Sequence, residues 1–299
     1  MSLKEALSNI DGVEFTEQAD LTKFSTMRLV AYGDLIVVES KEALIEVQKI
    51  LNSMKLNSRI VGMGANQLLP KGSKLPYLVL KFPFDKSELE SPKEEYTFPA
   101  SVRLSTLTAH AAKFGLQGWE SFTGIPASIG GAVVMNAGTN LGEIGPLITE
   151  VSLIRSNGED VTIKPDEKSF EYRKSHIVCK GDVIYQVKMK HLGINEGIKD
   201  KIKNYLELRN KTQPLKEKTC GCVFKNSVGE LTCRAGMFID IMGLKGLTHN
   251  GIRVSNKHAN FMENFGSASY EDILELIKLV KFELKLHYGV DFETEVKID

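Results

Sequence analysis

The sequence predicts an α+β fold in which short strands are interrupted by helices and hairpins. Asn157-Gly158, between two runs rich in apolar and β-branched residues, is a typical hairpin turn. Helical spacing of apolar residues is confined to separate stretches, most clearly residues 270–288, which Ser269 and Gly289 would begin and end. Strands and helices do not alternate regularly, which argues against a doubly wound parallel sheet.

Composition and charge limit the classes of protein to which this chain can belong. The 299 residues are 42% hydrophobic and 25% charged, which is typical of a globular chain of two or three domains. The 38 basic residues balance 38 acidic ones, so the chain has no overall attraction to nucleic acid. No uncharged run is long enough for a membrane span, and the N-terminal residues lack the apolar core of a secretory signal. With only four cysteines, these features predict a cytoplasmic protein with reduced thiols.

The first predicted domain, residues 1–82, is a small α/β unit. Apolar runs predict strands at residues 35–38 and 77–82, and a strand followed by a glycine turn over residues 59–67. Ser40 predicts the start of a helix, because apolar residues recur at helical spacing after it.

A proline- and charge-rich connection, residues 83–92, predicts the boundary with a second domain, residues 83–195. Its predicted elements are a helix from Ser105 to Gly115 and strands at residues 148–154, 161–163 and 183–189. The third predicted domain, residues 196–299, opens with a helix that carries Ile198 and Ile202 and closes with the long amphipathic helix.

Four glycines and a proline surround a short apolar run between Gly124 and Gly138. Glycine permits positive φ and close backbone approach, and Ile125-Pro126 favours an extended entry, so successive amides can face an anionic or planar cofactor. A glycine-rich turn before a buried helix explains the same pattern.

Gly62-Met-Gly-Ala-Asn66 follows a predicted strand and suggests a second contact to phosphate, because its glycines let backbone N–H groups face an anion. The chain lacks the third glycine of the dinucleotide fingerprint and has no GxxxxGK[ST] loop, which argues against Rossmann and P-loop sites. A flavin held by other means is compatible with both observations.

Polar side chains gather in three further segments. Residues 172–176 combine two cations, two hydroxyls and an imidazole, but such charge runs are usually solvated loops. Residues 254–261 form a strand-like stretch whose hydroxyl, amide, lysine and imidazole side chains suit a polar ligand. An edge strand whose side chains bond within the protein explains the same residues equally well. Glu293 and Glu295, at strand period, would share one face, which by default is a solvent face.

The segment from Cys220 to Asn226 holds two thiols, a lysine and an amide. With Cys233 it allows a metal site, but a C-x-C pair lacks the C-x₂-C spacing typical of structural zinc. A reactive or acidic thiol is the better interpretation, and no metal is predicted.

Together and in this order, these segments resemble the UDP-N-acetylenolpyruvoylglucosamine reductases, flavoenzymes of bacterial peptidoglycan synthesis. The most specific match is residues 124–138, which resemble the family signature Gly-Ile-Pro-Gly-x-x-Gly-Gly-Ala-x-x-Met-Asn-Ala-Gly. Residues 25–28 and 62–66 resemble its Asn-Thr-Phe-Arg entry and its Gly-x-Gly-Ser-Asn loop. The short distance from residue 191 to Cys220 resembles the subclass without an extra tyrosine-bearing insertion.

The resemblance implies a two-subdomain FAD-binding unit of the vanillyl-alcohol-oxidase type and a C-terminal α+β substrate-binding domain. It implies FAD as cofactor, NADPH as hydride donor and UDP-N-acetylglucosamine enolpyruvate as substrate, which is reduced to UDP-N-acetylmuramate. A role in cell wall biogenesis, cell shape, the cell cycle and cell division follows from that product. No nucleic acid, membrane or obligate protein partner is implied.

The resemblance also implies roles for individual residues. The implied cofactor-binding residues are Gly62, Met63, Gly64, Ala65, Asn66, Gln67, Gly124, Ile125, Pro126, Ser128, Gly130, Gly131, Asn136, Ala137 and Gly138. The implied substrate-binding residues are Tyr172, Lys225, Asn226, Ser255, His258 and Asn260. Arg173 and Glu295 would stabilise an enolate-like intermediate, with Glu295 protonated or acting through water.

Cys222 stands where many family members carry the serine that protonates the substrate carbon. A free thiol has a pKa of about 8.5, so a thiol can serve as the general acid. A nearby cation such as Lys225 would favour the thiolate, which cannot donate a proton.

Two alternative functions remain open at this point. One is a flavin oxidase that acts on another substrate. The other is a non-catalytic flavin- or nucleotide-binding paralogue whose thiols sense redox state.

Overall fold

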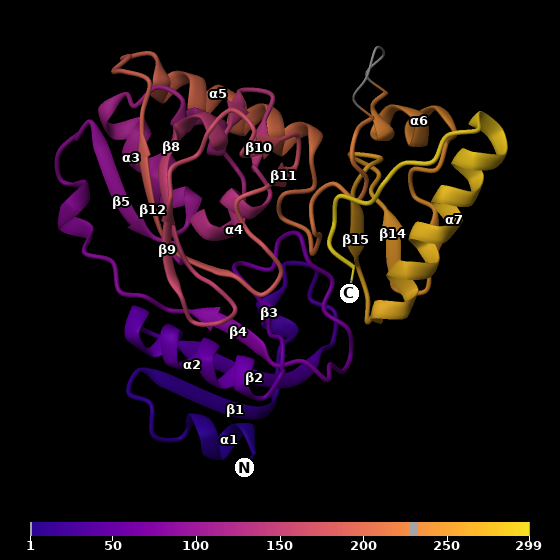
Figure 1. Ribbon diagram of the computed structural model, residues 1–299. Coiled ribbons are helices and arrows are strands. Elements are labelled where there is room, and N and C mark those ends of the chain that lie inside the picture. The colour runs from indigo at the N-terminus through magenta and orange to yellow at the C-terminus, as the bar shows by residue number, and fades with distance from the viewer. Residues whose placement is uncertain (1, 228–232, 299) are drawn as a thin grey trace. The chain divides into compact units, whose positions relative to one another are not determined.

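The computed structural model describes residues 2–227 and 233–298 (Figure 1). The chain divides into two compact units, and each is described by itself. Unit 1 comprises Met1–Ala19, Gly33–Met63 and Lys74–Leu206, and unit 2 comprises Asp20–Tyr32, Gly64–Ser73 and Glu207–Asp299. These units interleave along the chain, so the predicted division into residues 1–82, 83–195 and 196–299 stays a prediction.

The first sheet of unit 1 has the strand order β1-β2-β4-β3. Its strands are β1 (Val13–Asp20), β2 (Tyr32–Val38), β3 (Arg59–Ile60) and β4 (Tyr77–Leu80). β4 pairs in parallel with both β2 and β3, so this region contains one strand–helix–strand crossover within the predicted α+β fold.

Helix α2 (Lys41–Ser53) makes that crossover (Figure 1). Its Leu44 and Val47 belong to one apolar core with Ile36 and Leu78 of the sheet. The Ser40 hydroxyl accepts the Ala43 N–H at 3.1 Å, which confirms the predicted cap. A short helix, α1 (Leu3–Leu7), precedes the sheet.

The second sheet of unit 1 is antiparallel, with the order β5-β12-β8-β9. Its strands are β5 (Glu95–Pro99), β8 (Ile148–Ile154), β9 (Asp160–Ile163) and β12 (Val183–Lys190). The Asn157-Gly158 turn joins β8 to β9, which confirms the predicted hairpin. The core of this sheet includes the fully buried Trp119 and Phe98.

Smaller elements complete unit 1. They are α3 (Leu104–Phe114), α4 (Ile129–Val134), β6 (Gly138–Thr139), β7 (Gly142–Glu143), β10 (Phe170–Glu171) and β11 (Lys174–Ser175). The 3-10 helices in the described part of the chain are η1 (Thr22–Phe24), η2 (Lys86–Leu89), η3 (Trp119–Phe122) and η4 (Gly145–Leu147). α3 begins at Leu104 after Arg103, not at Ser105 as predicted, but it ends at Gly115 as predicted. α5 (Ile198–Thr212) spans the division between the units.

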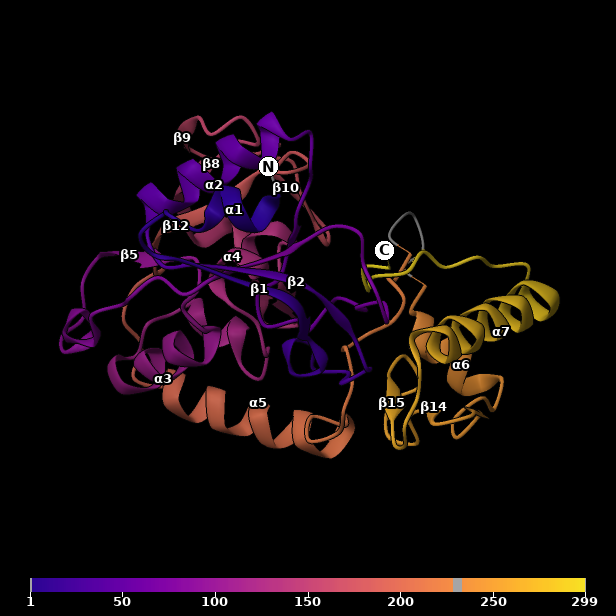
Figure 2. The same cartoon turned by 90° about the horizontal axis from the view of Figure 1, so that it is seen from below.

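Unit 2 is built on a three-stranded antiparallel sheet, β13 (Thr248–His249), β14 (Ile252–Val254) and β15 (Met262–Asn264). Helix α7 (Tyr270–Tyr288) lies along this sheet next to α6 (Ala235–Ile241), as Figure 2 shows. Ser269 and Asp272 form the predicted capping box, and Gly289 ends the helix in a left-handed conformation.

Two strand predictions in unit 2 are wrong. The stretch from Val254 to Phe261 is not a strand, because β14 ends at Val254 and a turn follows. Glu293 and Glu295 lie in an irregular segment that pairs through isolated bridges. In both segments the backbone bonds to neighbours distant in sequence, which period-2 reasoning does not reveal.

Candidate active site

The glycine segment and the end of β3 meet within unit 1. A Cβ atom added at Gly62 would lie 2.6 Å from the Ser128 hydroxyl oxygen. Ser128 begins α4 and its hydroxyl accepts the Gly131 N–H at 3.4 Å. Gly62 and Gly131 are both exposed. The two segments therefore present backbone without side chains to solvent, a surface that suits a phosphate or a planar ring.

The other glycines of the signature are required for different structural reasons. Gly124 has φ 76°, as expected of a position that needs glycine. Gly130 and Gly138 have no positive φ, and instead allow close packing. A Cβ at Gly130 would lie 2.8 Å from the Ala100 Cβ, and one at Gly138 would lie 2.8 Å from the Glu143 Cα. Close approach is therefore the main reason for glycine at these two positions.

Arg173 lies beside the end of the glycine segment. Its Nη2 donates to the Gly138 carbonyl at 3.0 Å, and its Nη1 is 3.7 Å from the Glu143 carboxylate. Its guanidinium carbon lies 5.1 Å from the centre of the Tyr172 ring. Residues 172–176 are thus not a detached solvated loop, and the predicted catalytic arginine is held by the predicted cofactor segment.

The Asn136 amide is engaged within the protein. It donates to the Glu143 carboxylate at 2.7 Å and to the Glu171 carbonyl at 3.0 Å, and accepts the Gly145 N–H at 3.0 Å. Contact of Asn136 with a cofactor stays a prediction.

A second group of predicted residues gathers within unit 2. The backbone from Cys222 to Lys225 runs between two other segments. On one side Cys222 bridges to Phe261, and on the other the Glu295 N–H donates to the Val223 carbonyl at 2.8 Å. The Asn260 amide donates to the Phe224 carbonyl at 2.8 Å and accepts the Phe224 N–H at 2.9 Å. Cys222, Asn260 and Glu295 therefore come from adjacent backbone segments.

The loop from Gly64 to Gln67 adjoins the same segments of unit 2. The Asn66 amide donates to the Glu295 carbonyl at 3.1 Å, and the Lys297 N–H donates to the Asn66 carbonyl at 3.0 Å. Gly62 and Met63 belong to unit 1, so the predicted cofactor loop crosses from one unit to the other.

Gly64→Ala is expected to destabilise the protein. Gly64 has φ 60°, and an added Cβ would clash with the Phe24 carbonyl and lie 2.7 Å from the Ser25 Cα. Backbone strain of this kind costs about 1–3 kcal/mol before the clash is counted. Thermal unfolding should therefore show an apparent Tm lowered by several degrees.

Gly72→Ala is the matched control for that prediction. Gly72 lies in unit 2 as well, and a Cβ added there meets no atom within 4 Å. Its Tm should stay near that of the wild type, and equal Tm values for the two variants would contradict the steric explanation.

The predicted substrate residues of unit 2 already have partners. The Lys225 ammonium lies 3.0 Å from the Glu293 carboxylate, so its positive charge is balanced. The Asn226 side chain accepts the Ala235 N–H at 3.1 Å. Ser255 is fully buried, and its hydroxyl accepts the N–H groups of Lys257 and His258 at 3.1 and 3.3 Å. Their contacts with substrate stay predictions.

The surroundings of His258 favour the neutral imidazole. Burial lowers its pKa below the ordinary value, and the charge of Lys245 acts in the same direction. Its Nδ1 accepts the Asn260 N–H at 3.3 Å, which leaves the other ring nitrogen as the donor. We expect any contact of His258 with substrate to be a neutral hydrogen bond.

The cysteines differ in their surroundings. Burial raises the pKa of Cys220 to about 12, so this thiol stays protonated in the core. Cys179 is exposed, and Cys222 and Cys233 are half-buried. Within residues 2–227 and 233–298, no group of three or more His, Cys, Asp or Glu side chains is placed to hold a metal ion.

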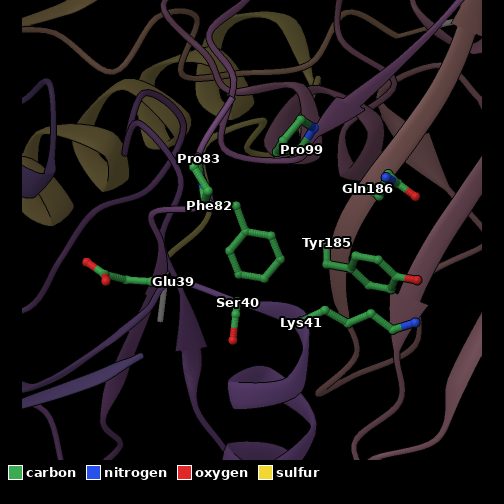
Figure 3. Close-up of a pocket in the computed structure, with 8 residues that line it drawn as sticks. All are labelled: Glu39, Ser40, Lys41, Phe82, Pro83, Pro99, Tyr185 and Gln186. Atoms are coloured by element: carbon green, nitrogen blue, oxygen red, sulfur yellow. The ribbon is translucent and has the colours of Figure 1, made fainter. Parts of the chain in front are cut away.

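A cavity of about 360 Å³ opens in unit 1 (Figure 3). It is lined by Glu39, Ser40, Lys41, Phe82, Pro83, Pro99, Tyr185 and Gln186. Lys41 pairs with Asp160 and lies 5.3 Å from the Tyr185 ring centre, and the Tyr185 hydroxyl donates to Asp160 at 3.1 Å. None of the predicted site residues lines this cavity, so we do not take it as the candidate active site.

Two features of the site were missed by the sequence analysis. Glu143 contacts Arg173 and Asn136, and no motif in the sequence points to it. The Thr26 hydroxyl donates to the Thr219 carbonyl at 2.7 Å, and the Thr26 N–H donates to the Gly64 carbonyl at 3.1 Å. The entry segment thus supports the Gly64 loop within unit 2.

Comparison with known proteins identifies the family. Residues 213–298 match the family model of the C-terminal domain of UDP-N-acetylenolpyruvoylglucosamine reductase, and residues 35–164 match that of an FAD binding domain. A UDP-N-acetylenolpyruvoylglucosamine reductase of Clostridium tetani is 34% identical over 303 residues, which cover 99% of this chain and 96% of the relative. The chain belongs to this reductase family.

Other members of the reductase family agree over the same length. The reductase of Syntrophomonas wolfei is 32% identical over 282 residues, covering 93% of this chain and 92% of its own. The crystal structure of the reductase from Thermus caldophilus matches with a TM-score of 0.79 and 32% identity, covering 95% of this chain and 98% of that one. The predicted fold is confirmed: an FAD-binding unit of the vanillyl-alcohol-oxidase type and a C-terminal α+β domain.

The residues of unit 1 fit the FAD that this domain type binds. Gly62 and Gly131 expose backbone where the end of β3 meets the start of α4, and a side chain at Gly62 would fill that space.

Among the helices that the structure describes, none has the length and apolar character to cross a bilayer.

Proposed function

We propose that the protein catalyses the NADPH-dependent reduction of UDP-N-acetylglucosamine enolpyruvate to UDP-N-acetylmuramate, a step in peptidoglycan precursor synthesis. The observation that supports this most is the similarity to reductases along nearly the whole chain. When bound, FAD would supply the hydride chemistry that connects NADPH to the methylene carbon of the enolpyruvyl group. The protein must bind, orient and protonate the substrate.

Arg173 stabilises the negative charge that develops on the enolpyruvyl carboxylate. Its side chain is only 17% exposed, so its charge is less screened by water than that of a surface arginine. The bond to the Gly138 carbonyl fixes one end of the guanidinium and leaves its orientation little freedom.

Cys222 supplies the proton to the carbon next to the carboxylate, as the serine does in many family members. Lys225, the nearby cation in the sequence, pairs with the Glu293 carboxylate at 3.0 Å. Glu295 assists from the adjacent segment in a protonated form or through water, because a bare carboxylate would repel the developing charge.

The remaining predicted residues bind the substrate. Lys225 and Asn226 offer a cation and an amide for carboxylate or diphosphate oxygens, and Tyr172, Ser255, His258 and Asn260 complete the predicted set. The reaction takes place in the cytoplasm and requires no membrane, nucleic acid or obligate protein partner.

The first test follows the flavin absorbance under anaerobic conditions. NADPH should bleach the flavin, and added UDP-N-acetylglucosamine enolpyruvate should restore the absorbance promptly. A reduced flavin that stays reduced would contradict the proposed substrate, and protein that binds no flavin would contradict the proposed function as a whole.

The same experiment separates the alternatives. A flavin oxidase would consume oxygen without the sugar nucleotide, and a non-catalytic paralogue would bind the nucleotide without turnover. The full-length similarity to reductases favours neither of them.

A further inference from the structure

The guanidinium of Arg173 is placed between two oxygen groups of one hairpin. Strands β6 and β7 form this hairpin, in which Gly138 pairs with Glu143. The Gly138 carbonyl accepts from Arg173 Nη2 at 3.0 Å, while the Glu143 carboxylate lies 3.7 Å from Nη1. A single hairpin thus contacts both terminal nitrogens of the guanidinium.

The position of the Glu143 carboxylate is itself fixed from two directions. Asn136, which is 2% exposed, donates to Glu143 Oε2 at 2.7 Å. Gly138 lies so close to Glu143 that any side chain there would displace it, with an added Cβ 2.8 Å from both Cα and Cγ of Glu143. The carboxylate therefore has a defined direction, although its side chain is 34% exposed.

Backbone strain coincides with this contact. Asn136 has φ 42° and Arg173 has φ 56°, both in the left-handed region. Non-glycine residues persist there only where the surrounding structure holds them, and such positions cluster at functional sites. A partly exposed ion pair contributes little to stability, so stability alone does not account for this arrangement.

We propose that Glu143 is a positioning residue that orients the Arg173 guanidinium toward the enolpyruvyl carboxylate. The inference rests on the proposed function. Glu143 supplies a fixed negative charge on one side of the arginine, and Asn136 holds that charge in place. The Gly138 carbonyl holds the other terminal nitrogen, Nη2, by accepting its hydrogen bond.

Glu143→Gln tests the charge while keeping the acceptor for Asn136. We expect reoxidation of the flavin by substrate to slow about 10- to 100-fold, because misorientation of a catalytic group has effects of this size. Flavin reduction by NADPH should be unchanged. FAD affinity, measured by flavin fluorescence, and the Tm should stay at wild-type values, because the hydrogen bond from Asn136 survives.

Glu150→Gln is the matched control. Its carboxylate also lies 3.7 Å from its partner, Lys164, and is 30% exposed, compared with 34% for Glu143. Loss of that ion pair should leave both half-reactions at wild-type rates. Equal slowing in the two variants would mean that Glu143 acts only through general charge, and would overturn the proposal.

A double-mutant cycle tests whether Glu143 acts through Arg173. In an Arg173→Lys background, Glu143→Gln should slow reoxidation little further, because the guanidinium that it orients is already gone. Additive losses, or a Glu143→Gln variant as fast as the wild type, would overturn the proposal. Failure of the wild-type reduced flavin to reoxidise with this substrate would instead contradict the proposed function, so the two failures are distinguishable.

Discussion

Cys222→Ala is expected to slow reoxidation of the reduced flavin by substrate about 10²–10⁴-fold, the usual contribution of a positioned general acid. The Cys222 backbone bridges to Phe261, and the next residue, Val223, accepts the Glu295 N–H at 2.8 Å. Because neighbouring segments fix this backbone, alanine removes the proton donor without releasing the segment. Rapid mixing under anaerobic conditions measures this half-reaction by itself.

Two variants complete that experiment. Cys222→Ser should keep appreciable activity, and its rate should not fall in alkaline solution, where free thiols ionise near about pH 8.5 but aliphatic hydroxyls do not. Cys179→Ser should react like the wild type, because Cys179 is exposed and is not among the predicted site residues. A Cys222→Ala variant with the wild-type rate would remove Cys222 from the mechanism.

The features that the sequence predicts correctly are those that local chemistry determines. A serine hydroxyl caps the helix that follows it, as at Ser40 and Ser269, and an Asn-Gly pair closes a hairpin between its neighbours. The bonds in each case join residues a few positions apart. Such elements can be read from a single sequence.

The features that it misses depend on partners far along the chain. The segment after Val254 is expected to continue as a strand, but its Asn260 carbonyl accepts the Val223 N–H at 2.8 Å and Phe261 bridges to Cys222, both about 40 residues away in sequence. Glu293 and Glu295 bond to the backbone near Cys222, about 70 residues away, and this pairing replaces a strand. Long-range contacts of this kind leave no periodic signal.

In the candidate site too, some features can be predicted from the sequence and others only from the structure. Motif resemblance pointed to Arg173, and the structure adds the Gly138 carbonyl and the Glu143 carboxylate that hold it. No residue pattern predicts that Glu143 faces Arg173, because the hairpin of β6 and β7 brings it there. A family resemblance thus identifies candidate residues, whereas only the structure shows which neighbouring groups hold them in place.

Arg173→Lys is expected to slow reoxidation of the flavin by substrate about 10²–10³-fold, as does loss of a donor to a developing negative charge. Arg173 Nη2 is committed to the Gly138 carbonyl, so a planar, forked group is needed to reach the substrate at the same time. Lysine has one terminal nitrogen and lacks the forked pair that would span both contacts. Reduction by NADPH should be unaffected.

Arg155→Lys is the matched control for this variant. It shows whether replacing an arginine in an ion pair is by itself enough to slow the reaction. Arg155 Nη1 lies 2.5 Å from the buried carboxylate of Asp182, a pair that links the β8–β9 turn to the start of β12. Its replacement should lower the Tm and leave the reoxidation rate unchanged, because this arginine holds the fold together. Arg173→Lys should do the reverse. If Arg173→Lys lowered the Tm as much and left the rate intact, Arg173 would be a structural residue, and the charge of the intermediate would have to be stabilised by another group.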